Sequence, residues 1–230
     1  METSAEGCSA ALYLEGAIYQ RFEVKPRGHS ELILQQMDDL LQEHGVALKD
    51  LDAIAYGRGP GSFTGVRIAA AVTQGTAYGA DLPVVPVSTL AALAQQAFRT
   101  TGHRHLLTAF DARMKEVYWA AYQIDQSDLP IVVIEEQVIA PEAVPLPIGD
   151  KWYGVGSGWA AYATQLRPMT TNLVIDIESR LFCQAYDIAL LGAAEFQRGN
   201  SVPAEQALPI YLRDRVAQTI IERQASAKKA

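Results

Sequence analysis

The pattern of apolar and polar positions along the chain predicts an α/β protein that opens with a hairpin and a helix. Two runs rich in strand-forming residues, 8–14 and 17–24, are separated by a single Glu-Gly pair, which predicts a β-hairpin. Segment 29–44 follows with apolar residues at helical spacing, as in an amphipathic helix. Residues 51–57 then have the pattern of a buried strand that leads directly into a glycine-rich turn.

The same alternation of strands and helices continues through the rest of the chain. A helix is expected at 62–79, then a short strand at 83–87 and a second helix capped by Ser88. Short connections between alternating strands and helices are typical of α/β folds. A second hairpin, 106–112 with 116–124, suggests a duplicated architecture. The other expected elements are a strand within 126–151, a strand and short helix from 152, a strand at 173–177, the longest helix within 178–198, an extended segment at 209–218 and a frayed polar end.

Composition narrows the class of protein. The chain has 230 residues, of which 49% are hydrophobic and 20% charged, as is typical of a globular protein with a sizeable core. Its net charge of −7 argues against a stand-alone nucleic-acid binder, because contacts to phosphates need a basic surface. We therefore expect any nucleic acid to be reached through a partner.

Cysteine usage and hydropathy indicate the compartment. Cys8 and Cys183 are the two cysteines of the sequence, and such a pair makes neither a disulfide framework nor a zinc site. The longest apolar runs are strand-sized, well short of the roughly 20 residues that span a bilayer. The first residues, METSAEG, are acidic and small, unlike a signal peptide. We therefore expect a cytoplasmic protein with reduced cysteines and no membrane segment.

The glycine-rich turn at 57–67, GRGPGSFTGVR, has two possible roles. Glycines before a helix can let a phosphate approach the backbone, but the lysine of a nucleotide-binding P-loop is missing. The helix that follows carries Ala71, Gly75 and Gly79 at every fourth position, which leaves a groove along one face. A glycine inside a helix costs about 1 kcal/mol relative to alanine, and this cost is easiest to explain where another backbone packs closely. We therefore favour close packing, within the chain or between subunits, over anion binding.

Residues elsewhere form no convincing catalytic or metal site. His103 and His105 are a close pair without a third ligand nearby, so we expect an exposed loop before a strand. Asp111 ends an apolar strand, but the turn after it lacks the glycines that a phosphate needs, which favours a charge cluster that stabilises the hairpin. Three serines could act as nucleophiles. None lies in a complete Gly-x-Ser-x-Gly elbow, although GVGSG at 154–158 comes near it.

Six segments, taken in chain order, resemble a known family. They are ETSAEGCSAAL, GHSELIL, GRGPGSFTGVRIAAAVTQGTAYG, PVVPVSTLAALA, DARMKEVYWAAY and PIYLR. Together they resemble TsaB, also called YeaZ, the bacterial subunit for tRNA threonylcarbamoyladenosine synthesis. The resemblance extends to about residue 215, and GPGSFTGVR with its small-residue helix is its most specific part.

The resemblance implies a fold like that of actin, sugar kinases and Hsp70 (the ASKHA fold), with two related α/β lobes at 1–100 and 101–215 and a polar tail at 216–230. It also implies a subunit that is not itself the enzyme and needs no cofactor or metal. In the family, TsaD carries the metal and transfers the threonylcarbamoyl group to adenosine 37 of tRNAs that read codons beginning with A. TsaB is the degenerate paralogue that pairs with TsaD, or with a second copy of itself, and the ATPase TsaE completes the complex.

Carried onto this sequence, the pairing helices of the family match 29–44 and 62–79. The residues expected at the partner interface lie on these two segments. They are His29, Leu32, Ile33, Gln36, Met37, Leu40, Ser62, Phe63, Thr64, Arg67, Ile68, Ala71, Val72, Gly75 and Gly79.

An enzyme is the alternative to a binding subunit. Such an enzyme would bind or hydrolyse a nucleotide with the same fold, and a peptidase is a further alternative that lacks a readable nucleophile and base. The candidates for a nucleotide site are Thr3, Ser4, Asp111, Gly156 and Gly158.

The chain departs from the family pattern at its start. Family members begin with a basic residue and a short apolar strand before the Glu-Thr-Ser turn, whereas Met1 directly precedes Glu2 in this sequence. We therefore expect the first sheet to contain a gap or an exposed edge, and the chain to be less stable than its relatives.

Overall fold

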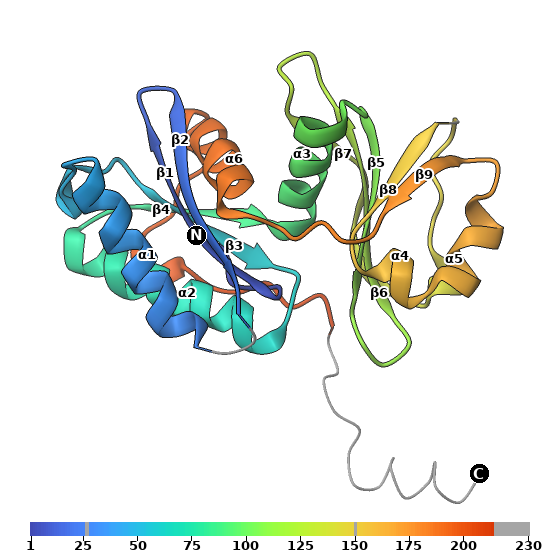
Figure 1. Cartoon of the computed structure of the whole chain (residues 1–230), viewed down its shortest axis with the longest axis horizontal. Helices are drawn as coiled ribbons and strands as arrows, with labels where there is room; N and C mark the ends of the chain where they lie inside the picture. The colour runs from blue at the N-terminus through green and yellow to red at the C-terminus, as the bar shows by residue number, and fades with distance from the viewer. Residues whose placement is uncertain (26–27, 150, 214–230) are drawn as a thin grey trace, which may run out of the picture.

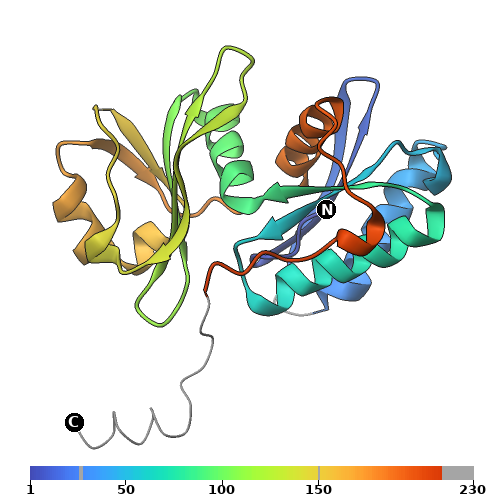
Figure 2. The ribbon, with the colours of Figure 1, turned by 180° about the vertical axis from the view of Figure 1, so that it is seen from behind.

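The computed structural model describes residues 1–25, 28–149 and 151–213, whose elements form two groups around different sheets (Figure 1). The first group contains strands β1 to β4 with helices α1, α2 and α6. The second contains a five-stranded sheet with α4 and α5, and α3 lies between the groups (Figure 2). The structure is thus a mixed α/β fold.

The first group contains two separate two-stranded sheets. Strand β1 (Gly7–Leu14) pairs antiparallel with β2 (Ala17–Val24) across the Glu-Gly turn, which confirms the predicted hairpin. Strand β3 (Ile54–Gly59) pairs in parallel with β4 (Val84–Ser88). No strand within the described part of the chain pairs β1 with β3, so the predicted gap in the first sheet is confirmed.

Helices cover both faces of these strands. Helix α1 (His29–Glu43) packs on β1 and α2 (Phe63–Ala80) packs on β3, so the two helices lie on the same face (Figure 1). Helix α6 (Ala185–Gln197) covers the opposite face, against β1, β3 and β4. The chain therefore returns to the first group after it has built the second. None of the helices in the described ranges is both long and apolar enough to cross a bilayer.

The second group is a five-stranded sheet in the order β7-β6-β5-β8-β9. Strands β5 to β7 are antiparallel neighbours, while β8 and β9 continue the sheet in parallel. The bounds are β5 His105–Asp111, β6 Val117–Ile124, β7 Pro130–Ile139, β8 Trp152–Val155 and β9 Val174–Glu178.

Each face of this sheet has its own apolar core. Helix α3 (Thr89–Thr101) packs on one face, while α4 (Gly158–Ala161) and α5 (Ala163–Thr170) cover the other. Trp119 and Trp159 fill the centre of that second core, with ring centroids 5.5 Å apart and both side chains fully buried. Two buried tryptophans of this size anchor the short helix α4 on the sheet.

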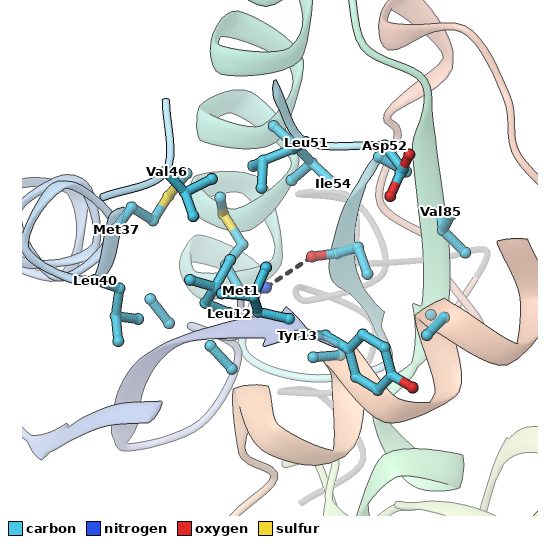
Figure 3. A pocket seen from close by; sticks show the side chains of 18 of the residues that line it. Met1, Leu12, Tyr13, Met37, Leu40, Val46, Leu51, Asp52, Ile54 and Val85 are labelled. Carbon is cyan, nitrogen blue, oxygen red and sulfur yellow. Dashed lines mark hydrogen bonds between the residues drawn. The ribbon is translucent and has the colours of Figure 1, made fainter. Parts of the chain in front are cut away.

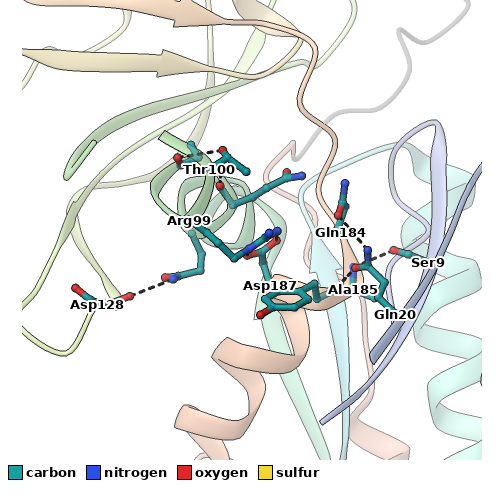
Figure 4. Close-up of polar contacts among 12 residues, drawn as sticks. Ser9, Gln20, Arg99, Thr100, Asp128, Gln184, Ala185 and Asp187 are labelled. Atoms are coloured by element: carbon teal, nitrogen blue, oxygen red, sulfur yellow. Dashed lines mark hydrogen bonds and ion pairs between the residues drawn. The ribbon is translucent and has the colours of Figure 1, made fainter. Parts of the chain in front are cut away.

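A buried ion pair joins α3 to α6. Arg99 donates to both carboxylate oxygens of Asp187, at 3.1 and 2.9 Å (Figure 4). The Asp187 side chain is fully buried, whereas that of Arg99 is one-third exposed. Burial raises the pKa of Asp187, and the hydrogen bonds from Arg99 oppose that effect. Arg99 therefore compensates the negative charge of the buried Asp187 carboxylate.

Most of the predicted elements are present, but the longest helix was placed wrongly. It is α2, with 18 residues, whereas α6 has 13 and begins only at Ala185. Residues before Ala185 are extended because Cys183 is fully buried and the Ala185 amide donates to the Ser9 hydroxyl at 2.9 Å. The predicted extended segment at 209–218 is described to residue 213. Its remainder and the polar tail at 216–230 lie outside the described residues.

Candidate partner-binding surface

The glycine-rich turn holds the start of the chain. Ser62 caps α2, with its hydroxyl accepting a hydrogen bond from the Gly65 amide at 3.1 Å. A Cβ on Gly65 would lie 2.1 Å from the carbonyl oxygen of Thr3, and one on Gly61 would lie 2.6 Å from Cβ of Ser4. Only glycine permits this approach, so these two glycines are explained by close packing inside the chain.

Helix α2 has a continuous stripe of exposed residues along most of its length. Positions 64, 67, 71, 75 and 78 fall within a narrow arc of a 3.6-residue helix, and all are exposed. The opposite arc packs into the first group. We call the exposed stripe the α2 outer face; it consists of Thr64, Arg67, Ala71, Gly75 and Tyr78, with Gly79 at its margin. The buried arc consists of Gly65, Val66, Ala69, Ala70, Thr73 and Ala77.

Nothing in the described part of the chain uses the groove on the α2 outer face. A Cβ on Gly75 or on Gly79 would meet no atom within 4 Å. Intramolecular packing therefore does not explain these glycines, in contrast to Gly61 and Gly65 at the start of the helix. A helix-interior glycine lowers helix stability by roughly 0.8–1 kcal/mol relative to alanine, and the described fold offers no compensating contact.

An aromatic and basic cluster lies at the N-terminal end of the α2 outer face. The Arg67 guanidinium lies 3.5 Å from the centroid of the Phe63 ring, and its Nε donates to the hydroxyl of Tyr211 at 2.7 Å. Phe63 and Tyr211 are each about half exposed, at 48% and 45%. Stacking on an aromatic ring holds the guanidinium in place without neutralising it. Arginine and tyrosine are the residue types most enriched at interface hot spots.

The predicted interface residues of α1 are mostly used within the fold. Ile33, Gln36 and Leu40 are buried in the core, so a partner cannot reach them. Leu32 and Met37 are partly buried and pack against the same core. The exposed side of α1 is mainly polar and acidic, and consists of Ser30, Glu31, Leu34, Gln35, Asp38, Asp39, Gln42 and Glu43. The accessible part of the predicted surface therefore lies on α2.

Other residues of the surface were not found by sequence reasoning. Tyr78 is 77% exposed and projects beside Gly75, and Tyr211 joins the surface through Arg67. Helical spacing from Ala71 and Gly75 could have identified Tyr78, because residue 78 lies on the same arc. No local pattern could have brought Tyr211 to α2, since 144 positions separate it from Arg67.

His29, one of the residues expected at the partner interface, contacts backbone oxygens near the start of the chain. Its imidazole lies 3.4 Å from the Thr3 carbonyl oxygen and 2.5 Å from that of Lys25. The ring is partly buried. It helps to hold the beginning of α1 against the first residues of the chain.

The first two nucleotide candidates are buried against the glycine-rich turn. Thr3 is fully buried and its hydroxyl donates to the Gly65 carbonyl at 2.7 Å. Ser4 is 4% exposed, and its carbonyl accepts from the Ser62 amide at 2.8 Å. Both residues therefore fix the start of the chain to α2.

The other nucleotide candidates lie in the second group. Asp111 accepts hydrogen bonds from the Arg113 amide at 2.7 Å and from the Tyr162 hydroxyl at 3.1 Å, and it forms an ion pair with Arg113. Gly156 and Gly158 pack against the Ala109 carbonyl. The hydrogen bonds of Thr3 and Ser4 stay in the first group and those of Asp111 in the second, so the candidate residues form two separate sets.

The histidine pair is held by aromatic rings. His103 stacks on Tyr153 with centroids 4.4 Å apart, and His105 lies 5.1 Å from Trp152. The expected exposed loop is therefore wrong for this pair, because His105 lies in β5 and both rings are partly buried. Residues 1–25, 28–149 and 151–213 contain no cluster of three or more His, Cys, Asp or Glu side chains that could hold a metal ion.

A buried carboxyl group lies beside the candidate nucleotide residues. Glu2 is fully buried over Gly57, and one of its oxygens accepts from the Ser4 amide. Its other oxygen, Oε2, has no hydrogen-bond partner among the described residues. Burial raises the pKa of Glu2 above its ordinary value, and the bonds to Ser4 oppose that effect.

Replacing Glu2 by glutamine is expected to stabilise the protein increasingly as the pH rises from 5 to 8. Because the folded-state pKa is raised above 4.5, the folded state keeps a proton that the unfolded state releases, and stability falls as the pH rises. Glutamine has no such proton. We expect the Tm of the variant to exceed that of the parent by about 5 °C at pH 8, with little difference at pH 5. Calorimetric scans across this range measure the effect.

The matched control is Glu6→Gln, which removes a carboxyl group from an exposed position in the same segment. Its Tm should differ from that of the parent only slightly, as for most exposed substitutions. A Glu2→Gln difference that stays constant between pH 5 and 8 would contradict a buried Glu2 with a raised pKa.

Comparisons with known proteins agree on one family. A family model described as TsaD, tRNA N6-adenosine threonylcarbamoyltransferase, matches residues 23–219. The tRNA threonylcarbamoyladenosine biosynthesis protein TsaB of Escherichia coli K12 is 41% identical over 220 residues, which cover 94% of each chain. The TsaB protein of Haemophilus influenzae is 38% identical and covers 94% of this chain and 93% of its own.

Solved structures give the same result. A Pseudomonas aeruginosa protein described as similar to the peptidase YeaZ superposes with a TM-score of 0.86 and 44% identity, over 92% of this chain and 96% of its own. A second structure, described as YeaZ from the same organism, has the same TM-score and identity and covers 91% of this chain.

Proposed function

Because the chain belongs to the TsaB (YeaZ) family, we propose that it is a non-catalytic subunit of the complex that makes N6-threonylcarbamoyladenosine in tRNA. In this proposal it binds and activates TsaD, which modifies adenosine 37 of tRNAs that read codons beginning with A. The ATPase TsaE joins the larger complex. The protein acts in the cytoplasm, where it reaches tRNA only through the complex, in keeping with its net charge of −7.

The observation that carries this proposal is the unused groove on the α2 outer face. Gly75 and Gly79 have open space around them, and Ala71 and Thr64 on the same stripe are also small. Since the distance between packed helices depends on the side chains at the contact, small residues let a second helix approach closely. The Arg67, Phe63 and Tyr211 cluster adds an aromatic and basic anchor at one end. TsaD, or a second copy of this chain in its absence, is the proposed occupant.

We propose that the two groups of elements are the two related lobes of an ASKHA fold. The first lobe would comprise β1 to β4 with α1 and α2, together with α6 and the segment that follows it, because α6 packs on β1, β3 and β4 whereas α3 packs on the five-stranded sheet. The second lobe would then be built around the five-stranded sheet. This division revises the contiguous boundary at residue 100 that the sequence predicts.

The residues that would form a nucleotide site, if the protein were an enzyme, have structural roles instead. Thr3 and Ser4 are buried against α2, and Asp111 is held by Arg113 and Tyr162. No observation in the described part of the chain favours a nucleotide-hydrolysing or peptidase function over a binding subunit.

The proposal is tested by measuring the mass of the protein in solution, alone and after mixing with TsaD of the same organism. Light scattering should show a homodimer that exchanges into a one-to-one heterodimer. Titration of the chain alone with ATP should give no heat at micromolar concentrations. A mass that TsaD leaves unchanged would contradict the proposal, and heat from ATP alone would favour the enzyme alternative.

A further inference from the structure

Residues 207–213, which we call the strap, run along the first group and end on the second (Figure 2). The Leu208 carbonyl accepts a hydrogen bond from the hydroxyl of Tyr56 at 3.0 Å, and the Ile210 amide donates to the Arg58 carbonyl at 2.8 Å. Both partners belong to β3, and Tyr56 is fully buried. The first part of the strap is therefore fixed to the first group.

The strap binds the half of β3 that contacts the second group. Ile54 and Ala55, in the other half, line a cavity of about 270 Å³ beside β1 (Figure 3). Arg58, in contrast, forms an ion pair with Glu136 of β7 at 3.2 Å, and both of these side chains are largely buried. The strap is thus anchored where β3 already meets the five-stranded sheet.

Arg213, at the end of the strap, binds the turn between β5 and β6 (residues 112–116). Its Nε and Nη2 both donate to the Glu116 carboxylate, the former at 3.0 Å, and Nη2 also donates to the Ala112 carbonyl at 3.1 Å. The Arg213 side chain is only 17% exposed. Two charge-assisted bonds from one planar guanidinium fix the geometry of the pair. Arg213 therefore has the contacts of a latch between the strap and the second group.

The turn that Arg213 binds has an unfavourable backbone. Residues 113–115, Arg-Met-Lys, all have positive φ, between 54° and 63°, and this left-handed region is costly for residues other than glycine. Two hydrogen bonds close the turn. The Ala112 amide donates to the Glu116 carbonyl, and the Glu116 amide donates to the Arg113 carbonyl, both at 3.0 Å. Because such a turn needs support from its surroundings, it should loosen when the latch is released.

The strap also carries a residue of the cluster at the end of the α2 outer face. Tyr211 accepts a hydrogen bond from Arg67 at 2.7 Å and lies only two positions before Arg213. Their Cα atoms can be at most about 7 Å apart. A movement of Tyr211 on α2 is therefore passed to Arg213 with little slack.

We propose that the strap couples the α2 outer face to the second group, with Arg213 as a latch that is either bound to the β5–β6 turn or released from it. A partner that packs on Arg67 and Tyr211 holds the strap on α2 and so favours the latched state. Because coupling between two sites is reciprocal, a bound latch in turn favours the partner. The identity of the partner rests on the proposed function, whereas the strap and the latch belong to this chain alone.

Hydrogen exchange of the chain alone tests the coupling. The reporters are the amides of Ala112 and Glu116, whose bonds close the turn. Arg213→Met removes the latch, and both amides should then exchange at least about tenfold faster. Tyr211→Phe keeps the ring but removes the hydroxyl that accepts from Arg67, and we expect the same amides to exchange about threefold faster or more. Each variant should keep its Tm within about 4 °C of the parent, because both sites are at the surface.

The matched control is Tyr78→Phe, which removes a hydroxyl from another exposed tyrosine of the α2 outer face. It should leave the exchange of the turn unchanged. In the Arg213→Met background, Tyr211→Phe should add no further acceleration, because the latch is already released. Unchanged exchange of the turn in Tyr211→Phe, or an equal change in Tyr78→Phe, would overturn the coupling.

TsaD of the same organism extends the test to the partner. At saturating TsaD, the Ala112 and Glu116 amides of the parent should exchange at least about threefold more slowly, and this protection should be absent in Arg213→Met. Protection that persists in Arg213→Met would mean that TsaD covers the turn directly, which would overturn transmission through the latch. A failure of TsaD to bind at all would contradict the proposed function, and the exchange of the chain alone would still decide whether the strap couples α2 to the turn.

Discussion

Gly75→Leu is expected to weaken binding of TsaD about 100-fold or more while leaving the subunit itself folded. A leucine at the centre of the α2 outer face adds a large side chain where the proposed partner helix packs, and overpacking of this kind is costly in a well-packed contact. Within the chain the new side chain meets open space, and leucine is the better helix former by roughly 0.8 kcal/mol. Calorimetric titration with TsaD measures the loss, and nucleoside analysis of tRNA from a complemented strain measures its consequence.

The control adds the same bulk to another exposed helix position. Ala160→Leu, on α4, places a leucine in the second group, away from α2. It should leave both binding and the tRNA modification level unchanged. Gly75→Ala adds one methyl group and should give an intermediate loss with a higher Tm than the parent. Normal binding and modification with Gly75→Leu would exclude the α2 outer face as the TsaD contact.

Helix α2 shows which features the periodicity of a sequence can predict and which it cannot. The sequence after GPGSFTG predicted a helix with small residues at every fourth position. The helix is present, and the space beside Gly75 and Gly79 is open in the described fold. Periodicity says which residues share a face, but not whether that face is covered. From the sequence, close packing was the single explanation for all of these glycines, whereas the structure divides them into two groups. Gly61 and Gly65 admit the first residues of the chain, while Gly75 and Gly79 meet nothing in the described fold.

The same limit explains the interface list on α1. The family resemblance assigned the helix at 29–44 to the interface, and the residues chosen on it, Leu32, Ile33, Gln36, Met37 and Leu40, have the helical spacing that marks the apolar side of an amphipathic helix. In a single domain that side is normally the one turned to its own core, and Ile33 and Leu40 are indeed buried there. A resemblance can thus assign a whole helix to an interface without saying which of its sides is free, and the apolar side of this helix is the one that its own core uses.

Long-range contacts were beyond sequence reasoning. The Arg67 to Tyr211 bond and the Arg99 to Asp187 pair join positions 144 and 88 residues apart. Each of these residues is unremarkable in its local pattern, and only the return of the chain in α6 and in the segment after it brings them together.

Arg99→Met is expected to cause the largest loss of stability of any substitution considered, about 3–5 kcal/mol near neutral pH. The Asp187 carboxylate is fully buried and receives two hydrogen bonds from Arg99, so removal of the guanidinium leaves an uncompensated buried charge (Figure 4). Arg99 also lies 4.2 Å over the ring of Tyr186, a contact that methionine keeps only in part. A loss of this size lowers the Tm by about 10 °C, which calorimetry or circular dichroism measures.

Two further variants separate the buried charge from the lost contacts. Asp187→Asn in the Arg99→Met background removes the buried charge and should recover part of the lost stability. Arg104→Met is the matched control, because it breaks the exposed ion pair between Arg104 and Asp128 and should lower the stability by at most about 1 kcal/mol. Burial already raises the pKa of Asp187, and without Arg99 it rises further. The folded single variant then binds a proton that the unfolded chain releases, so its deficit should shrink as the pH falls from 8 to 5. A deficit that is equal at both pH values, with no recovery in the double variant, would mean that packing on Tyr186 rather than charge compensation is what Arg99 contributes.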